Sequence, residues 1–352
     1  MSYIKKIAID LRFLKINDNY SDFIINLTKI IIQNNNNYFF EIFTNKNFWN
    51  YFNFWNSQTK LFKNGFIKDN LNFWNFLNKN NFDFAIFFSS KSPIFYKKKY
   101  ILFVETLANI HFPNNQNVIR KYLDNFFFTK NIKKATKICV FNEITKDEIN
   151  DKYNIFEWNI EIINWAFLKK ELEKQENLSD LRIKYNIKWD FYIYSAWAWN
   201  DKNLWKLIEV FKKIEKNLLI LDEETIKDVN FRKKVINENL INKIFFIWET
   251  NLFEKDFFYR NSLWVLYPVL YSNFPFYLND ALNYNKEIFA SNLKIIKNIF
   301  ENKISYFNPN NTEDFIKTLE TKKGENIDYD DIFTKYNIEK SSINLNKIIK
   351  SL

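Results

Sequence analysis

The sequence predicts an α/β protein built from two Rossmann-like, doubly wound domains that face a central cleft. The chain has 352 residues, which is too long for one ordinary core and suits two. Hydrophobic residues make up 47% of it and are spread over the whole length, which is enough to bury two cores. Short apolar segments alternate with amphipathic segments of about 10 to 15 residues, and this alternation indicates parallel sheets of βαβ units.

In the first half, an alternating strand pattern at 3–13 precedes an amphipathic helix at 22–33. The other elements that we expect in this half are strands at 37–44, 83–90, 97–107, 135–143 and 159–167, and helices at 117–135 and 144–154. Strands that are apolar on both faces are typical of a parallel sheet. The segment 46–80 is rich in Asn and Phe, and its structure stays open.

The second half repeats this pattern. The expected strands are 189–196, 217–224, 243–250, 262–269 and 287–292, and the expected helices are 201–217, 229–240, 253–261, 277–285 and 312–320. The two series meet near residue 168. We therefore predict an N-terminal domain at 1–168, a second Rossmann-like domain at 169–330, and a C-terminal helix at 331–352 that can cross back to the first domain.

Composition restricts the class of protein. No run of about 18 apolar residues predicts a transmembrane helix, and the N-terminus lacks the pattern of a signal peptide. The single cysteine, Cys139, fits a cytoplasmic protein. The net charge of +10 has two interpretations, a Lys-rich surface or attraction to anionic lipid and phosphate-bearing substrates. The basic residues are scattered and form no nucleic-acid motif.

Glycine is unusually rare. The chain has 2 glycines and 11 tryptophans, whereas glycine is usually about 7% of a protein. Trp165, Trp197, Trp199 and Trp248 follow strand-like segments, where tight turns usually require glycine. We hypothesise that UGA codons meaning glycine were translated as tryptophan, against the alternative of genuine tryptophan enrichment. Tryptophan at 197 and 248 in mass spectra of the native protein would contradict this hypothesis.

Several segments in order resemble glycosyltransferase family 4. AIDLRFL is similar to the family's IGIDARFL, IEIINWAF to I.VIpNGv, and NKIFFIWET to drv.FlGev, with tryptophan at glycine positions in the last two. YIYSAWAWNDKNLWKLI is similar to yilyvGg...KNl..Li, and YFNPNNTEDFIKTLE to fdP.d.e.la..i. The resemblance covers nearly the whole length and is strongest from about residue 131 to 322.

This resemblance implies a GT-B fold and an enzyme of polysaccharide biosynthesis. The expected reaction moves a hexose from a nucleotide-diphosphate sugar to a glycan or lipid-linked acceptor, with retention of configuration. No cofactor or metal is expected, because such sites neutralise the leaving diphosphate with cationic side chains and helix N-termini. The expected location is cytoplasmic, with peripheral contact to the inner face of an anionic membrane as a further option.

The resemblance assigns donor binding first to the segment after the strand 189–196. Lys202 has the position of the lysine in the KN motif, which contacts the donor diphosphate, and Asn203 completes that motif. A charge-assisted contact from Lys202 would offset the charge that develops on the leaving group. Trp197 and Trp199, at glycine positions, would line the same loop. The alternative for Lys202 is a solvated lysine at a helix start.

The second implied donor segment is similar to the family's PSlyEGFGlpllEAmacGkPViaSn. Two glutamates, eight residues apart in that pattern, correspond here to Ser272 and Asp280. Asp280 keeps a carboxylate that can accept hydrogen bonds from ribose hydroxyls, whereas Ser272 keeps no charge. Asn273, Phe274 and Pro275 replace the GFG segment, and Pro275 has no N–H to donate.

In the N-terminal domain, Glu105 follows a strand where the family often has a His-Asp pair. It can hydrogen-bond a sugar hydroxyl or act as a base, although a solvated strand-end glutamate is the alternative. His111 is the only histidine, and no catalytic role is assigned to it. The departures at Ser272 and Pro275 support a second hypothesis, a catalytically degenerate glycosyltransferase-like protein that serves in binding or assembly.

Overall fold

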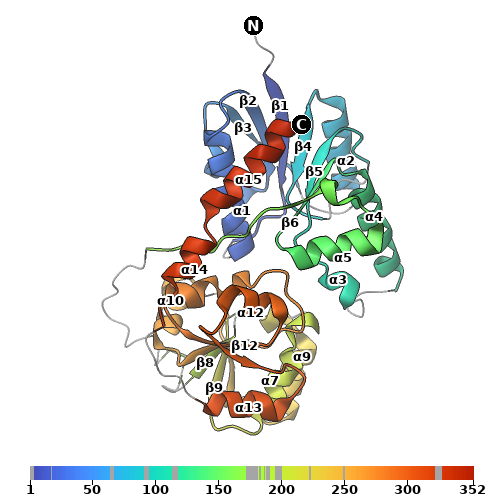
Figure 1. The fold of residues 1–352 in the computed structure, drawn as a ribbon. Coiled ribbons are helices and arrows are strands. Elements are labelled where there is room, and N and C mark those ends of the chain that lie inside the picture. The colour runs from blue at the N-terminus through green and yellow to red at the C-terminus, as the bar shows by residue number, and fades with distance from the viewer. Residues whose placement is uncertain are drawn as a thin grey trace. The chain divides into compact units, whose positions relative to one another are not determined.

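The structure, a computed structural model, describes residues 4–352 apart from residues 17, 186, 222 and 249 and the segments 64–66, 91–94, 113–117, 172–180, 182–183, 188–190, 195–199 and 322–326. The chain divides into two compact units (Figure 1). Unit 1 comprises Met1–Leu168 with Tyr336–Leu352, and unit 2 comprises Lys169–Lys335. The C-terminal helix groups with unit 1, and its segment starts at 336 where the sequence suggested 331.

Unit 1 contains a parallel sheet whose strands follow the order β3-β2-β1-β4-β5-β6-β7. The strands are β1 (Lys5–Leu11), β2 (Tyr38–Thr44), β3 (Ser57–Leu61), β4 (Phe84–Phe87), β5 (Tyr100–Phe103), β6 (Lys137–Val140) and β7 (Ile160–Ile162). All residues of β4 and β5 are buried, as expected for central strands covered on both faces. The strand β3 lies in the segment that the sequence left open.

Helices lie on both sides of this sheet (Figure 1). They are α1 (Asn19–Gln33), α2 (Ile67–Lys79), α3 (Ala108–His111), α4 (Val118–Lys134), α5 (Glu143–Tyr153) and α15 (Ile338–Ser351), with 3₁₀ turns η1 (Lys46–Phe52) and η3 (Glu157–Asn159). The Asp18 side chain caps α1 by accepting from the N–H of Ser21. The helix α15 packs against α1, which explains why the end of the chain belongs to unit 1.

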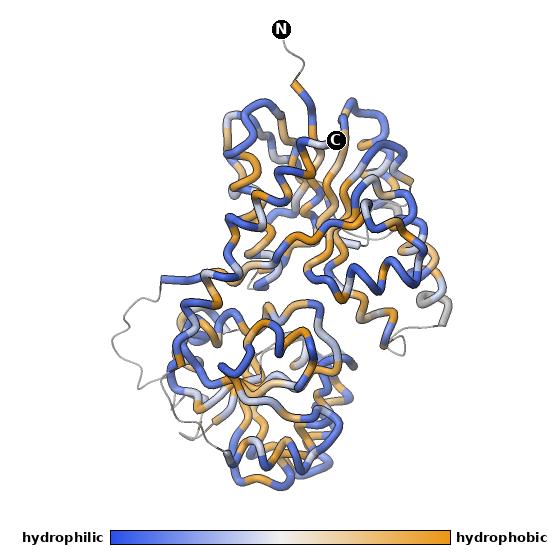
Figure 2. The backbone as a smooth tube through the Cα atoms, viewed as in Figure 1, coloured by the Kyte–Doolittle hydropathy of each residue, from blue (hydrophilic) through white to orange (hydrophobic). Residues whose placement is uncertain are grey.

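Unit 2 repeats this architecture with the strand order β10-β9-β8-β11-β12-β13. The strands are β8 (Phe191–Tyr194), β9 (Asn217–Ile220), β10 (Ile244–Phe246), β11 (Trp264–Tyr267), β12 (Glu287–Ser291) and β13 (Ser305–Phe307). Every residue of β8, β9, β11 and β12 is buried, and Figure 2 shows hydrophobic strands inside more hydrophilic helices. This distribution places the core of unit 2 around its sheet.

The helices of unit 2 surround this sheet (Figure 1). They are α7 (Leu204–Phe211), α8 (Glu223–Lys227), α9 (Val229–Asn237), α10 (Leu252–Asn261), α11 (Asn279–Asn283), α12 (Lys294–Phe300), α13 (Thr312–Glu320) and α14 (Asp330–Lys335), with 3₁₀ turns η4 (Asn200–Lys202) and η5 (Phe276–Leu278). One face of α7 is buried, including Leu204, Leu207, Ile208 and Phe211, as the periodicity predicted.

Asparagine occupies several backbone positions of positive φ, a conformation that glycine usually adopts. Among the described residues, positive φ occurs at Asn154, Asn203, Asn239, Asn285 and Glu301. Asparagine tolerates the left-handed region better than most residues, because its short side chain can hydrogen-bond locally. The scarcity of glycine is therefore compatible with several tight turns in this fold.

The strand order of each sheet reverses at one point, between β1 and β4 in unit 1 and between β8 and β11 in unit 2. In sheets of this kind, ligands bind at the carboxyl ends of the strands beside such a switch point. Two doubly wound α/β units confirm the predicted fold class. A ligand is therefore expected to bind at the carboxyl ends of the strands beside these two switch points.

Candidate functional site

The switch point of unit 2 lies at the carboxyl ends of β8 and β11. The turn η4 follows β8, and a loop that ends in η5 follows β11. The backbone N–H of Leu270 donates to the carbonyl oxygen of Asp201 at 2.6 Å, which ties the two segments together. The fold thus brings the segment with Lys202 and the segment with Ser272 to one place.

Lys202 is held inside this switch point. Its side chain is 14% exposed, and its Nζ lies 2.5 Å from a carboxylate oxygen of Asp201. The same Nζ lies 5.8 Å from the centre of the Tyr277 ring, a cation–π distance. Asp201 itself is buried. The sequence analysis singled out Lys202 but not Asp201, although a carboxylate directly before the lysine in the sequence could have indicated an ion pair.

The loop after β11 is packed into unit 2. The hydroxyls of Ser272 and Tyr267 are 3.3 Å apart, and the Tyr271 hydroxyl donates to the side-chain oxygen of Asn273. Asn273 and Phe274 are buried. Their side chains therefore serve the packing of the loop, and the donor-binding role assigned to Ser272, Asn273 and Phe274 stays a prediction.

Asp280, expected to contact ribose, is buried between two lysines. Its carboxylate oxygens lie 2.6 Å from Nζ of Lys255 and 2.9 Å from Nζ of Lys170. Burial alone would raise the pKa of Asp280, but the two ammonium groups outweigh burial and hold this pKa well below its usual range. Asp280 therefore links α11 to α10 and to the first residues of unit 2, and its contact with ribose stays a prediction.

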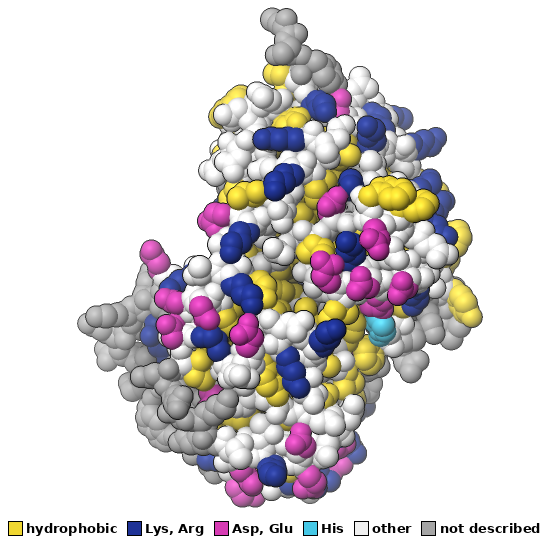
Figure 3. All heavy atoms as spheres, in the orientation of Figure 1, with side chains coloured by type: hydrophobic (Ala, Val, Ile, Leu, Met, Phe, Trp, Pro, Cys, Tyr) yellow, Lys and Arg dark blue, Asp and Glu magenta, His cyan; other side chains and the backbone are white. Residues whose placement is uncertain are grey.

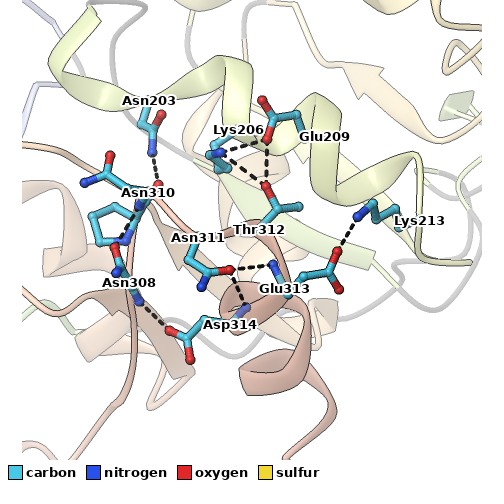
Figure 4. A network of polar contacts seen from close by, with 11 residues as sticks. Asn203, Lys206, Glu209, Lys213, Asn308, Asn310, Asn311, Thr312, Glu313 and Asp314 are labelled. Atoms are coloured by element: carbon cyan, nitrogen blue, oxygen red, sulfur yellow. Dashed lines mark hydrogen bonds and ion pairs between the residues drawn. The ribbon is translucent and has the colours of Figure 1, made fainter.

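Asn203 connects the lysine segment to the loop before α13 (Figure 4). Its φ of 56° places it in the left-handed region, and its side-chain amide donates to the carbonyl oxygen of Pro309 at 2.8 Å. Beside it, Lys206 contacts both Glu209 and Thr312. The segment Lys202–Asn203 and the segment Asn308–Pro309, which the sequence analysis treated separately, are thus in direct contact. Donor binding by Asn203 stays a prediction.

The tryptophans at expected glycine positions have different environments. Trp165 is 2% exposed and stacks on Tyr20 and Phe23. Trp248 is 47% exposed and lies beside the guanidinium of Arg232. Neither has positive φ, so an indole fits the backbone at both positions. Trp197 and Trp199 lie outside the described residues, and the recoding hypothesis stays a prediction.

Glu105 lies at the carboxyl edge of the sheet in unit 1, two residues after the end of β5. Its carboxylate accepts from the backbone N–H of Ser90 at 2.8 Å and contacts the Ser89 hydroxyl at 3.3 Å. Both serines follow β4, so Glu105 lies beside the switch point of unit 1. His111 instead contacts the carboxylate of Glu148, and this pairing on α3 and α5 agrees with a structural role.

Two further findings concern the described part of the chain. It contains no group of three or more His, Cys, Asp or Glu side chains arranged to hold a metal ion. Within the same residues, no helix has both the length and the apolar character needed to cross a membrane.

Part of this chain is similar in sequence to known proteins. Residues 181–336 match the family model described as "Glycosyl transferases group 1". The O-antigen chain mannosyltransferase RfbU of Salmonella typhimurium is 21% identical over 224 residues. That match covers 62% of this chain and 60% of the relative's length.

The fold matches solved structures of glycosyltransferases. Sucrose-phosphate synthase from Thermosynechococcus elongatus has a TM-score of 0.74 and 11% identity, covering 99% of this chain and 98% of its own. Anabaena HepE, solved with UDP-glucose, has a TM-score of 0.74 and 9% identity, covering 99% and 100%. WaaG, a glycosyltransferase involved in lipopolysaccharide biosynthesis, has a TM-score of 0.68 and 10% identity, covering 96% and 94%. The fold class is thus GT-B, and residues 181–336 are similar to the group 1 glycosyl transferases.

Proposed function

We propose that this protein is a glycosyltransferase that moves a hexose from a nucleotide-diphosphate sugar to a glycan or lipid-linked acceptor in cell-surface polysaccharide synthesis. The position of Lys202 carries the proposal. This lysine lies at the switch point of unit 2, inside the segment that matches the family. The mannosyl transfer named for RfbU and the UDP-glucose bound to HepE support the same class of donor and acceptor.

The chemistry follows from the charge that the reaction creates. When the sugar leaves its donor, negative charge builds on the diphosphate, and a cation nearby stabilises the transition state. Lys202 supplies such a cation directly before the start of α7, whose backbone N–H groups add a positive potential. We propose that these groups act without a metal ion and that the sugar is transferred with retention of configuration.

The test combines binding and turnover. Purified protein is assayed for hydrolysis or transfer of UDP-, GDP- and ADP-sugars, with and without EDTA. Lys202→Ala should lower kcat/KM about 10- to 100-fold, since a hydrogen bond to a charged group contributes about 1.5–3 kcal/mol. Lys213→Ala is the matched control, because Lys213 is about half exposed and pairs with Glu313. Absence of any nucleotide-sugar binding at millimolar concentration would overturn the proposal.

The loop after β11 favours a second candidate function. Ser272 has no charge where the family pattern has a glutamate, and Pro275 cannot donate a backbone hydrogen bond. A protein that binds the donor but does not turn it over would serve in binding or assembly of a polysaccharide complex. Donor binding without hydrolysis or transfer, in an assay supplied with lipid-linked and free glycan acceptors, would favour this alternative.

We further propose peripheral contact with an anionic membrane through α4. Tyr122, Leu123 and Phe126 of this helix are exposed, and Lys130 lies 5.6 Å from the ring of the exposed Phe95. Figure 3 shows basic and acidic side chains spread over the visible face, and hydrophobic side chains lie at the edge of unit 1 where α4 runs. Aromatic and basic side chains together suit the surface of an anionic bilayer.

Flotation with vesicles tests this contact. The protein should float with phosphatidylglycerol vesicles and not with phosphatidylcholine vesicles, and the variant with both Tyr122→Ser and Phe126→Ser should lose most of that binding. Equal binding of the wild type to both kinds of vesicle, or unchanged binding of the variant, would contradict the proposal.

A further inference from the structure

The most unusual feature of the candidate donor site is a carboxylate beside the lysine that is expected to bind phosphate. Asp201 is 2% exposed, and its carboxylate lies 2.5 Å from Nζ of Lys202. A site that binds a diphosphate gains from positive charge. The buried carboxylate of Asp201, at contact distance, cancels much of the positive charge that Lys202 brings to the site.

The position of Asp201 is fixed by the fold and independent of its charge. Its backbone carbonyl accepts the N–H of Leu270, and this contact holds the loop after β11 against η4. The hydroxyl of Tyr194, at the end of β8, reaches the carbonyl oxygen of Lys202 at 3.4 Å. Both contacts are made to backbone carbonyl oxygens of the turn and neither uses the carboxylate of Asp201, so a substitution that removes only its charge leaves these groups in place.

The negative charge of Asp201 also acts on the neighbouring strand end. Burial raises the pKa of the Tyr267 hydroxyl, and the negative charge of Asp201 raises it further. The Tyr267 hydroxyl lies 3.3 Å from the Ser272 hydroxyl in the donor loop. The field of this carboxylate thus extends across the carboxyl ends of β8 and β11, where a diphosphate would lie.

We infer that Asp201 is a counter-charge that limits how tightly the site holds a nucleoside diphosphate, so that Lys202 exchanges between Asp201 in the empty site and the diphosphate in the occupied one. This inference rests on the proposed function. The carboxylate keeps the ammonium group in place before the donor binds, and it repels the diphosphate product after the sugar has left. Asp201 contacts Lys202 and is a positioning residue, whereas Lys202 contacts the substrate.

The experiment measures binding of UDP, GDP and ADP to the full-length protein by calorimetry, and then uses whichever binds most tightly. Asp201→Asn keeps the size of the side chain and removes its charge. Removing a like charge close to the diphosphate should lower the Kd about tenfold, with a steeper dependence on salt. It should also lower kcat at saturating donor, because the product leaves more slowly. A role that is only structural predicts weaker binding, the opposite sign.

A second comparison keeps the test decisive where Asp201→Asn alone does not fold. Lys202→Gln removes the cation, and the double variant Asp201→Asn/Lys202→Gln replaces the ion pair by two amides. The double variant should bind the diphosphate more tightly than Lys202→Gln alone. Equal or weaker binding in either comparison overturns the inference while the proposed function stands. If the wild type binds none of the three nucleoside diphosphates, the proposed function fails and the inference falls with it.

Discussion

The carboxylates of Asp280 and Glu105 were both predicted to contact sugar hydroxyls, yet they differ in burial and in the groups that contact them. Asp280, in unit 2, is 3% exposed, and both of its oxygens contact lysine ammonium groups. Glu105, in unit 1, is only partly buried and accepts from the uncharged groups of Ser89 and Ser90. Two ion pairs tie Asp280 to other segments of unit 2, whereas the serine groups that contact Glu105 carry no charge and compete less strongly with a sugar hydroxyl for its carboxylate.

The largest expected effect tests the structural role of Asp280. Asp280→Asn removes the negative charge that Lys170 and Lys255 both contact. The free energy of unfolding should fall by about 2–3 kcal/mol, less than for a fully buried pair because both lysines reach solvent. Urea denaturation measures this as a lower midpoint with an unchanged slope. Asp330→Asn is the control, because its pair with Lys169 is exposed on both sides and should change stability by less than about 0.5 kcal/mol.

Lowering the pH should reduce the difference in the free energy of unfolding between the wild type and Asp280→Asn. The folded pKa of Asp280 is depressed, so its stabilising contribution is complete above the unfolded pKa of about 3.9 and is lost as pH falls towards the folded pKa. Urea denaturation at pH 5 and pH 3 should show the stability difference shrinking by about 1 kcal/mol. A difference that stays constant or grows at pH 3 would show that the ion pairs with Lys170 and Lys255 do not account for it.

A smaller effect on stability is expected at Asn203, which follows the turn η4 at the carboxyl edge of the sheet in unit 2. In unit 2 the chain leaves the lysine turn through a left-handed residue, with φ of 56°. Asn203→Ala should lower the free energy of unfolding by about 1–2 kcal/mol, because a Cβ without a hydrogen-bonding group disfavours this conformation. Asn203→Gly should lose less, although it also gives up the hydrogen bond to Pro309. Equal losses for both variants in urea denaturation would assign the effect to the hydrogen bond.

The sequence predicted most strands, because these depend on local patterns of apolar residues, and it singled out Lys202 through one short motif. It did not predict β3 or β13, whose residues are only partly apolar. The ion pairs of Asp280 were also hidden, because Lys170 is 110 residues away in the sequence. Pairings of this kind depend on which segments the topology brings together, and they cannot be predicted from a local sequence pattern.

The smallest effect on stability, and the most informative about function, is expected at Glu105. Glu105→Gln keeps an oxygen that accepts from the N–H of Ser90 and adds an amide that can donate to Ser89. The free energy of unfolding should therefore change by less than about 1 kcal/mol in urea. If Glu105 contacts a sugar hydroxyl, kcat should fall about 10- to 100-fold while stability is retained, and if it acts as a base, kcat should fall about 100-fold or more. Unchanged kcat would limit Glu105 to holding the turn after β4, and the functional contrast with Asp280 would disappear.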